Sequence, residues 1–148
     1  MLVAIGSDHG GFHLKEEIKQ LLAENRIEFH DFGTHSTESV DYPDIARSVG
    51  QAVASGQCER GIIICGTGIG VSIAANKIKG IRAALCHDVF SAQMSREHND
   101  ANILTMGERV IGPGLAGMIV MTWLKTEFAG GRHGRRVGKI TELESLCH

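Results

Sequence analysis

The chain has 148 residues, a length that suits one domain with a hydrophobic core of its own. Nineteen residues are glycine, well above the usual ~7%, yet two prolines and no repeated tripeptide exclude collagen and proline-rich disorder. The net charge of −2 gives no overall field that would attract nucleic acid or anionic lipid. No apolar run approaches the ~20 residues of a membrane span, so we expect neither kind of partner.

Short apolar runs alternate with amphipathic stretches along the whole chain. Strands are predicted over residues 2–5, 27–32, 60–65, 81–86 and 103–106. Helices are predicted over residues 12–26, 43–56, 71–78, 88–98 and 113–128, followed by a basic glycine-rich turn at 130–136 and a short C-terminal helix. This alternation predicts one α/β domain over residues 1–148, a three-layer α/β/α sandwich with a Rossmann-like five-stranded parallel sheet. Ligands of such sheets bind beyond the carboxyl ends of the strands.

The first strand is followed by a turn that contains Asp8, His9, Gly10 and Gly11. A carboxylate beside an imidazole at a strand end suits proton transfer or hydroxyl binding, although such a histidine can also be an ordinary hydrogen-bonded turn residue. His9 and His13 have the spacing of a helical metal pair, but the two glycines between them disfavour a helix. With no third ligand in evidence, we expect no metal.

The loop after the third strand, Cys-Gly-Thr-Gly-Ile-Gly over residues 65–70, is the strongest chemical signal. Its glycines allow backbone N–H groups to converge on one point, which predicts an anion-binding loop. A dinucleotide-binding loop requires G-x-G-x-x-G, whereas the third glycine here is Gly70, one position early, and the Gly-Lys-Ser/Thr of a P-loop is absent. A cysteine phosphatase would need an arginine where Val71 stands. A tight turn without a ligand remains an alternative.

Cys65 stands at a strand end among these N–H donors, a setting that favours a thiolate base or nucleophile. The alternative is a small buried hydrophobic side chain, and this is what we expect of Cys58, Cys86 and Cys147, unless they are surface thiols. The chain contains no C-x-x-C pair and begins with no basic, long-apolar export signal. We therefore expect reduced thiols and a cytoplasmic protein.

Polar and basic residues are concentrated in the second half of the chain. Residues 95–102 are densely polar, which is also what a solvated helix end would give. Arg109 follows the fifth strand, and Arg132, Arg135 and Arg136 lie among glycines, where they are either solvated or bind a phosphate bidentately. A thiol base, an imidazole acid, an anion-binding loop and phosphate-binding arginines together suit enolisation next to the carbonyl of a small phosphorylated ligand.

Six motifs carry a resemblance to a known family: SDHGG (7–11), ESVDYPD (38–44), ICGTGIGVSIAANK (64–77), IRAALC (81–86), MSREHNDANIL (94–104) and GGRHGRRVGKI (130–140). In this order they resemble the type B ribose-5-phosphate isomerases, a family that also includes allose-6-phosphate and galactose-6-phosphate isomerases. The resemblance implies a cofactor-free aldose–ketose isomerase of carbohydrate metabolism, in the pentose phosphate pathway, that works through an enediolate. Alternative functions are an isomerase of a 6-phosphohexose and a non-catalytic sugar-phosphate sensor.

The resemblance also implies a role for individual residues. Cys65 matches the family's base, and His98 the histidine that opens the sugar ring, with Asn99 beside it on the sugar hydroxyls. Thr67 would hydrogen-bond the thiol or the substrate, and Asp8 and His9 would contact the substrate near its reactive end. The oxyanion would be held by Gly66, Thr67, Gly68, Ile69 and Gly70, and the phosphate by Arg109, Arg132 and Arg136, whereas Arg135 matches no site position.

The family builds each site from two subunits. The resemblance therefore implies a homodimer or a dimer of dimers, with the C-terminal segment, about 130–148, packed on the partner subunit. This arrangement would explain why the arginines are so far from Cys65 in the sequence.

Overall fold

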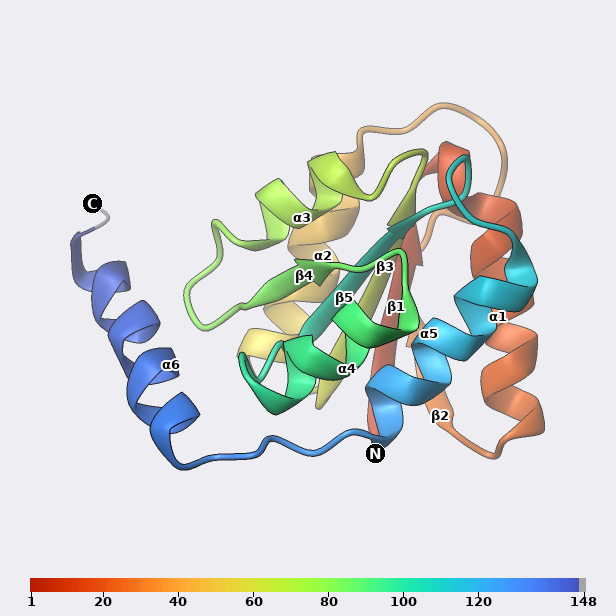
Figure 1. Cartoon of the computed structure of the whole chain (residues 1–148). Helices are drawn as coiled ribbons and strands as arrows, with labels where there is room; N and C mark the ends of the chain where they lie inside the picture. The colour runs from red at the N-terminus through yellow and green to blue at the C-terminus, as the bar shows by residue number, and fades with distance from the viewer. Residues whose placement is uncertain (147–148) are drawn as a thin grey trace.

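The computed structural model describes residues 1–146 and contains one five-stranded parallel sheet (Figure 1). The strands are β1 (Leu2–Ser7), β2 (Glu28–Asp31), β3 (Arg60–Cys65), β4 (Ala83–Leu85) and β5 (Ile103–Gly107). They lie in the order β2-β1-β3-β5-β4, so β1, β3 and β5 are adjacent at the centre. All four pairings are parallel, and the carboxyl ends of the strands therefore share one edge of the sheet.

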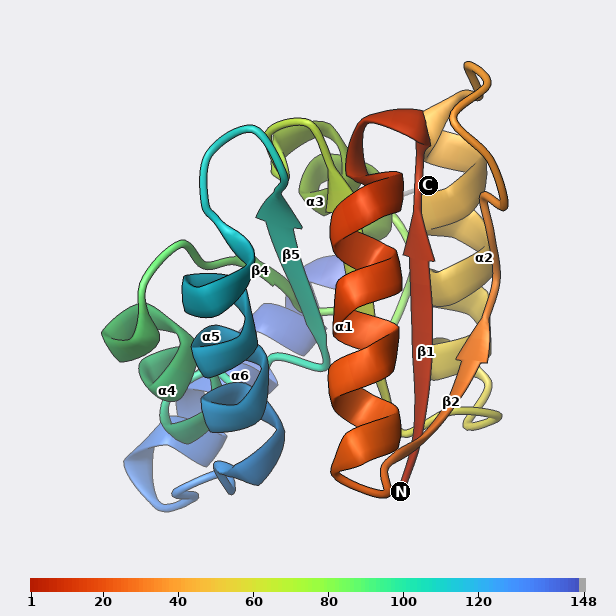
Figure 2. The same cartoon turned by 90° about the vertical axis from the view of Figure 1, so that its right-hand side faces the viewer.

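Helices cover both faces of the sheet. They are α1 (Phe12–Glu24), α2 (Tyr42–Ala54), α3 (Ile69–Ala75), α4 (Val89–Glu97), α5 (Pro113–Lys125) and α6 (Arg132–Leu143), with short 3₁₀ turns η1 (His9–Gly11) and η2 (Glu144–Leu146). One core cluster joins the sheet to α1, α4 and α5, and a second joins it to α2 and α3. Figure 2 shows α1, α4 and α5 on one side of β1 and α2 on the other. The expected three-layer α/β/α sandwich is confirmed.

Covering both faces explains why the central strands are continuously apolar. Val3 and Ile5 pack into the cluster under α1 and α5, whereas Ala4 between them packs into the cluster under α2. All six residues of β3 are buried. Alternate side chains of a strand point to opposite faces, so a strand with a helix layer on each side needs an apolar residue at every position.

The predicted elements are present, with differences at their ends. Asp88 caps α4 as expected, because its Oδ1 accepts the N–H of Ser91 over 2.6 Å. The helix predicted from Val71 begins two residues earlier, at Ile69, directly after Gly68. None of the helices in residues 1–146 is both long and apolar enough to cross a membrane.

The basic turn predicted over residues 130–136 is wrong. Residues 126–131 connect α5 to α6; Gly130 and Gly131 at the end of this segment have φ of +68° and +56°, and α6 begins at the next residue. Gly134 lies inside this helix, so the basic cluster is displayed on a helix rather than on a flexible turn. No residue of α6 is buried, and Figure 1 shows the helix apart from the three layers at the end of an extended segment.

Candidate active site

The carboxyl ends of β1 and β3 bring the first two predicted motifs into contact. The Asp8 side chain, 7% exposed, accepts the N–H of Gly10 over 2.9 Å and so fixes the turn after β1. A Cβ atom on Gly10 would lie 3.2 Å from the backbone nitrogen of Gly66. The turn that carries Asp8 and His9 therefore lies directly against the loop that follows Cys65, and a side chain on residue 10 would be in tight contact with the backbone of this loop.

His9 is oriented by a residue from a distant loop. Its Nδ1 accepts the N–H of Val40 over 3.2 Å. An imidazole nitrogen that accepts a hydrogen bond carries no hydrogen, so the neutral His9 ring has its hydrogen on Nε2. His9 can therefore present an N–H donor from Nε2.

Cys65 ends β3 and is 5% exposed. Its Sγ accepts the N–H of Gly68 over 3.1 Å. Gly68 has a φ of +78°, a left-handed conformation that glycine adopts without steric cost. The Thr67 Oγ1 accepts the N–H of Ile69 over 3.2 Å, which leaves the hydroxyl hydrogen to donate elsewhere.

Arg109 joins the same site from the loop after β5. Its backbone N–H donates to the carbonyl of Gly66 over 3.1 Å. A Cβ on Gly66 would lie 3.3 Å from the Arg109 Cζ, so the guanidinium lies against this glycine. A permanent positive charge is thus held beside the loop with the converging N–H groups, as anion binding requires.

Two further side chains contact this loop although they are absent from the predicted set. Tyr42 lies so close to Gly70 that a Cβ there would be 3.0 Å from the tyrosine hydroxyl oxygen. His87 accepts the N–H of Gly107 through Nε2 over 2.9 Å, at the strand end that supports the loop. Tyr42 stands within one of the motifs that carry the resemblance, but no local pattern marks His87, because its partner is twenty residues away.

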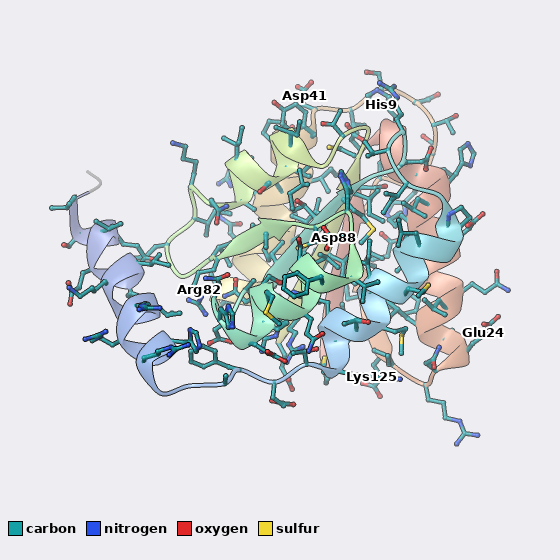
Figure 3. The ribbon with its side chains drawn as sticks, viewed as in Figure 1. His9, Glu24, Asp41, Arg82, Asp88 and Lys125 are labelled. Atoms are coloured by element: carbon teal, nitrogen blue, oxygen red, sulfur yellow. The ribbon has the colours of Figure 1, made fainter. Side chains whose placement is uncertain are left out.

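The other predicted residues form a second cluster at the opposite side of the sheet, where the amino ends of the strands lie (the amino edge). His98 is the C-cap of α4, at the edge where β5 begins, and its ring stacks on that of His133 in α6 with centroids 4.3 Å apart. Asn99 follows His98, and Arg132 and Arg136 are on the first turns of α6. Figure 3 labels His9 at one end of the molecule and Arg82, which precedes β4 at the amino edge, toward the other.

His133 is absent from the predicted set but belongs to this amino-edge cluster. Burial lowers the pKa of His133, and the nearby charges of His98, Arg132 and Arg136 lower it further. A cavity of about 440 Å³ separates α6 from the edge strand β4, and Asn99 and Ile140 are among its lining residues. Within one chain, then, the structure brings together Asp8, His9, Arg109 and residues 65–70, but not His98, Asn99, Arg132 or Arg136.

The model of the Ribose/Galactose Isomerase family matches residues 3–140. The chain is 62% identical to a putative sugar phosphate isomerase of Bacillus subtilis, over 97% of each chain. It is 54% identical to the ribose-5-phosphate isomerase B of Escherichia coli, over 96% of this chain and 95% of that one.

Solved structures give the same result. The structure of a ribose-5-phosphate isomerase B from Clostridium thermocellum superposes with a TM-score of 0.99 at 61% identity and covers all of both chains. These matches confirm the resemblance carried by the six motifs. The chain therefore belongs to the ribose/galactose isomerase family, among its type B ribose-5-phosphate isomerases, and is an isomerase.

Proposed function

We propose that this isomerase interconverts ribose 5-phosphate and ribulose 5-phosphate through a cis-enediolate, with Cys65 as the base and no cofactor. One observation carries the proposal: the Cys65 sulfur lies at a strand end, hydrogen-bonded to the Gly68 N–H, within a glycine-rich loop against which Arg109 lies. A base, backbone donors and a cation so arranged suit proton abstraction beside a carbonyl in an anionic substrate. The E. coli relative, more than half identical, supports the choice of sugar.

The proposed proton transfers begin at Cys65. The Cys65 thiolate takes the proton from C2, the C–H electron pair forms a C1–C2 double bond, and the aldehyde oxygen becomes an oxyanion. The loop of residues 66–70 would stabilise this oxyanion through the backbone N–H groups of Gly66, Thr67 and Gly70, since the N–H of Gly68 donates to the Cys65 Sγ and that of Ile69 to the Thr67 Oγ1. The thiol then returns the proton to C1, which leaves a ketone at C2.

A proton must also move between the two substrate oxygens, from O2 to O1. Asp8 is suited to this step because one carboxylate oxygen accepts the Gly10 N–H while the turn lies against the loop at Gly66. His9, with its hydrogen on Nε2, and the Thr67 hydroxyl can donate to neighbouring sugar oxygens.

Ring opening and part of the phosphate binding require the second cluster. His98 would assist opening of the furanose, Asn99 would bind sugar hydroxyls, and Arg132 and Arg136 would bind the phosphate with Arg109. Because the two clusters lie at opposite edges of one sheet, a small sugar phosphate cannot contact both within one chain. We propose that each site combines the carboxyl-edge cluster of one subunit with the amino-edge cluster of its partner.

The C-terminal segment, about 130–148, is suited to reach such a partner. No residue of α6 is buried, and Ile140 is 44% exposed. Near the carboxyl-edge site, Ile69 and Ile73 on α3 are 55% and 59% exposed, and Phe90 at the start of α4 is 70% exposed. Apolar surface of this kind favours association, so we propose a homodimer, or a dimer of dimers, of cytoplasmic chains.

Side-by-side kinetics test the proposed reaction. Purified protein is assayed with ribose 5-phosphate, allose 6-phosphate and galactose 6-phosphate, and solvent deuterium is followed into the product. We expect the highest kcat/KM with ribose 5-phosphate and deuterium on the carbon that is protonated. A preference for a six-carbon sugar, which the breadth of the matched family leaves as the second candidate, would correct the substrate. Binding of every sugar phosphate without turnover would indicate a sensor and refute the proposal.

A further inference from the structure

His87 stands where β4 stops pairing with β5. The last backbone bond between these segments runs from the Cys86 N–H to the Thr105 carbonyl, over 3.1 Å. In a continued parallel ladder, the next N–H of β5 on this side, that of Gly107, would bond to a backbone carbonyl of the neighbouring strand. Here it donates to the His87 Nε2 instead, over 2.9 Å. The imidazole thus extends the sheet by one hydrogen bond after the backbone of β4 has turned away.

The loop after Cys65 packs directly against Gly107. A Cβ on Gly107 would be 2.6 Å from the Cα of Thr67 and 2.8 Å from the Gly66 carbonyl oxygen. The two residues that follow Gly107 also bond to the loop. The Glu108 N–H donates to the Cys65 carbonyl over 2.9 Å and the Arg109 N–H to the Gly66 carbonyl over 3.1 Å. The end of β5 therefore determines where the thiol, the loop and the arginine lie.

We propose that His87 is a positioning residue of the active site. Its neutral imidazole accepts the Gly107 N–H, and through residues 107–109 this hydrogen bond maintains the positions of Cys65 and Arg109 relative to each other. The inference rests on the proposed function only in assigning catalysis to that loop. Among residues 1–146, no hydrogen bond, ion pair or ring contact joins the His87 side chain to Cys65 or Arg109. Its contribution is the single acceptor atom Nε2.

The surroundings of His87 favour the neutral ring that this role needs. Burial lowers the pKa of His87, whereas the adjacent carboxylate of Asp88 opposes this effect. The charged groups of the facing β5–α5 loop have other partners: the Glu108 Oε1 accepts the Leu14 N–H over 2.6 Å, and the Arg109 guanidinium lies against Gly66. A protonated imidazole has a hydrogen on both nitrogens and cannot accept the Gly107 N–H.

Two substitutions separate the acceptor from the bulk of the side chain. His87→Gln places an amide oxygen, which does not titrate, near the position of Nε2, whereas His87→Leu fills similar space without an acceptor. At pH 7.5 we expect His87→Leu to lower kcat for ribose 5-phosphate by about tenfold to a hundredfold, the effect of a displaced catalytic group, with a smaller change in KM. We expect His87→Gln to keep kcat within about threefold and to lose less activity than the wild type below pH 6.

A second readout does not depend on turnover. The rate at which iodoacetamide alkylates Cys65, followed by mass spectrometry of the Cys65 peptide, should change in His87→Leu and return toward wild type in His87→Gln. This rate tests the positioning role even if the substrate is another sugar phosphate. His30→Leu, on β2 away from the site, is the matched control and should change neither kcat nor the alkylation rate.

The inference would be overturned by a His87→Leu protein with wild-type kcat and wild-type Cys65 alkylation. It would also be overturned if His87→Gln were as impaired as His87→Leu in both readouts, since the acceptor would then not matter. If His87→Leu does not fold, the comparison of His87→Gln with wild type decides alone: superimposable activity below pH 6 would refute the role of the neutral imidazole.

Discussion

The backbone N–H of Gly68 donates to the sulfur of Cys65 over 3.1 Å, while the Cα of the same glycine lies directly on the backbone of Met106 in β5. The Thr105 Oγ1 adds a hydrogen bond to the Gly68 carbonyl over 3.0 Å. The Gly68 N–H, which donates to the proposed base, is therefore held in place by the buried strand β5. A donor held rigidly in this way does not have to rearrange while the proposed base takes up and returns the proton, which is the condition for effective electrostatic stabilisation.

Gly68→Ala tests this arrangement, with Gly80→Ala as its matched control. Both glycines have positive φ, +78° and +88°, but a Cβ on Gly68 would be 2.8 Å from the Met106 carbonyl carbon, whereas nothing lies within 4 Å at Gly80. We expect Gly80→Ala to cost about 1–2 kcal/mol for the left-handed conformation alone. Gly68→Ala should cost about 1–3 kcal/mol more, for overpacking against rigid backbone, and abolish most activity. Urea unfolding and kcat measure both effects, and equal costs at the two positions would contradict the contact.

Cys65→Ala should remove the base while leaving the substrate-binding groups in place. We expect kcat to fall by about 10²–10⁴-fold, the usual contribution of a general base, together with the loss of solvent deuterium incorporation. The affinity for a non-reactive sugar phosphate, measured by calorimetry, should change little. Cys58→Ala, at another buried cysteine outside the site, is the control and should retain turnover. Undiminished isomerisation by Cys65→Ala would refute the assignment of the base.

Mixing two inactive variants tests whether each site is shared between subunits. Cys65→Ala damages the carboxyl-edge cluster, and Arg132→Ala damages the amino-edge cluster. In randomly exchanged dimers of the two, one site in each mixed dimer is intact, so about one quarter of wild-type activity should return after denaturation and refolding together.

The control mixture combines Cys65→Ala with Asp8→Ala. These residues belong to the same cluster, so no mixed dimer contains an intact site and activity should stay absent. Recovery in neither mixture would mean that the two clusters do not meet across an interface, and the proposed sharing would be wrong.

The ion pair of Lys15 with Asp31 predicts a pH dependence of stability. Lys15 is fully buried and bonds to both carboxylate oxygens of Asp31 over 2.8 Å. Burial alone would raise the pKa of Asp31, but hydrogen bonds from Lys15, Lys19 and the Gly33 N–H outweigh it and lower this pKa below 3.8. The unfolded state therefore binds the proton more readily. The stabilisation is fully present above about pH 4 and is lost as pH falls through the folded-state pKa.

Lys15→Met should lower the free energy of unfolding by about 3 kcal/mol at pH 7, because it leaves a half-buried carboxylate with fewer partners. The difference from wild type should shrink as the pH falls below 4, where Asp31 becomes protonated. Urea unfolding at several pH values measures both. Lys139→Met, on the exposed surface of α6, should change stability by less than about 0.5 kcal/mol. A Lys15→Met protein as stable as this control would exclude the ion pair as a determinant of stability.

The layer architecture and most of the carboxyl-edge site could be predicted from the amino-acid sequence. The apolar runs of the strands and the 3.6-residue period of the helices are local patterns in the sequence. Strands that alternate with helices along a chain leave few topologies other than a parallel sheet. Because parallel strands end at a common edge, Asp8 and Cys65 could be expected to lie near each other before any coordinates were known. The family resemblance added the roles of these residues.

The folded structure was needed to show which distant residues actually meet. It separated His98 and Arg132 from Cys65 by the length of the sheet, which no spacing along the chain reveals. It placed the His87 imidazole on the Gly107 N–H, a contact that depends on where β4 leaves β5. It also turned the basic segment after Gly131 into a helix. Local sequence determines backbone conformation, but contacts between side chains far apart in the chain depend on how whole elements pack, and that is a property of the fold.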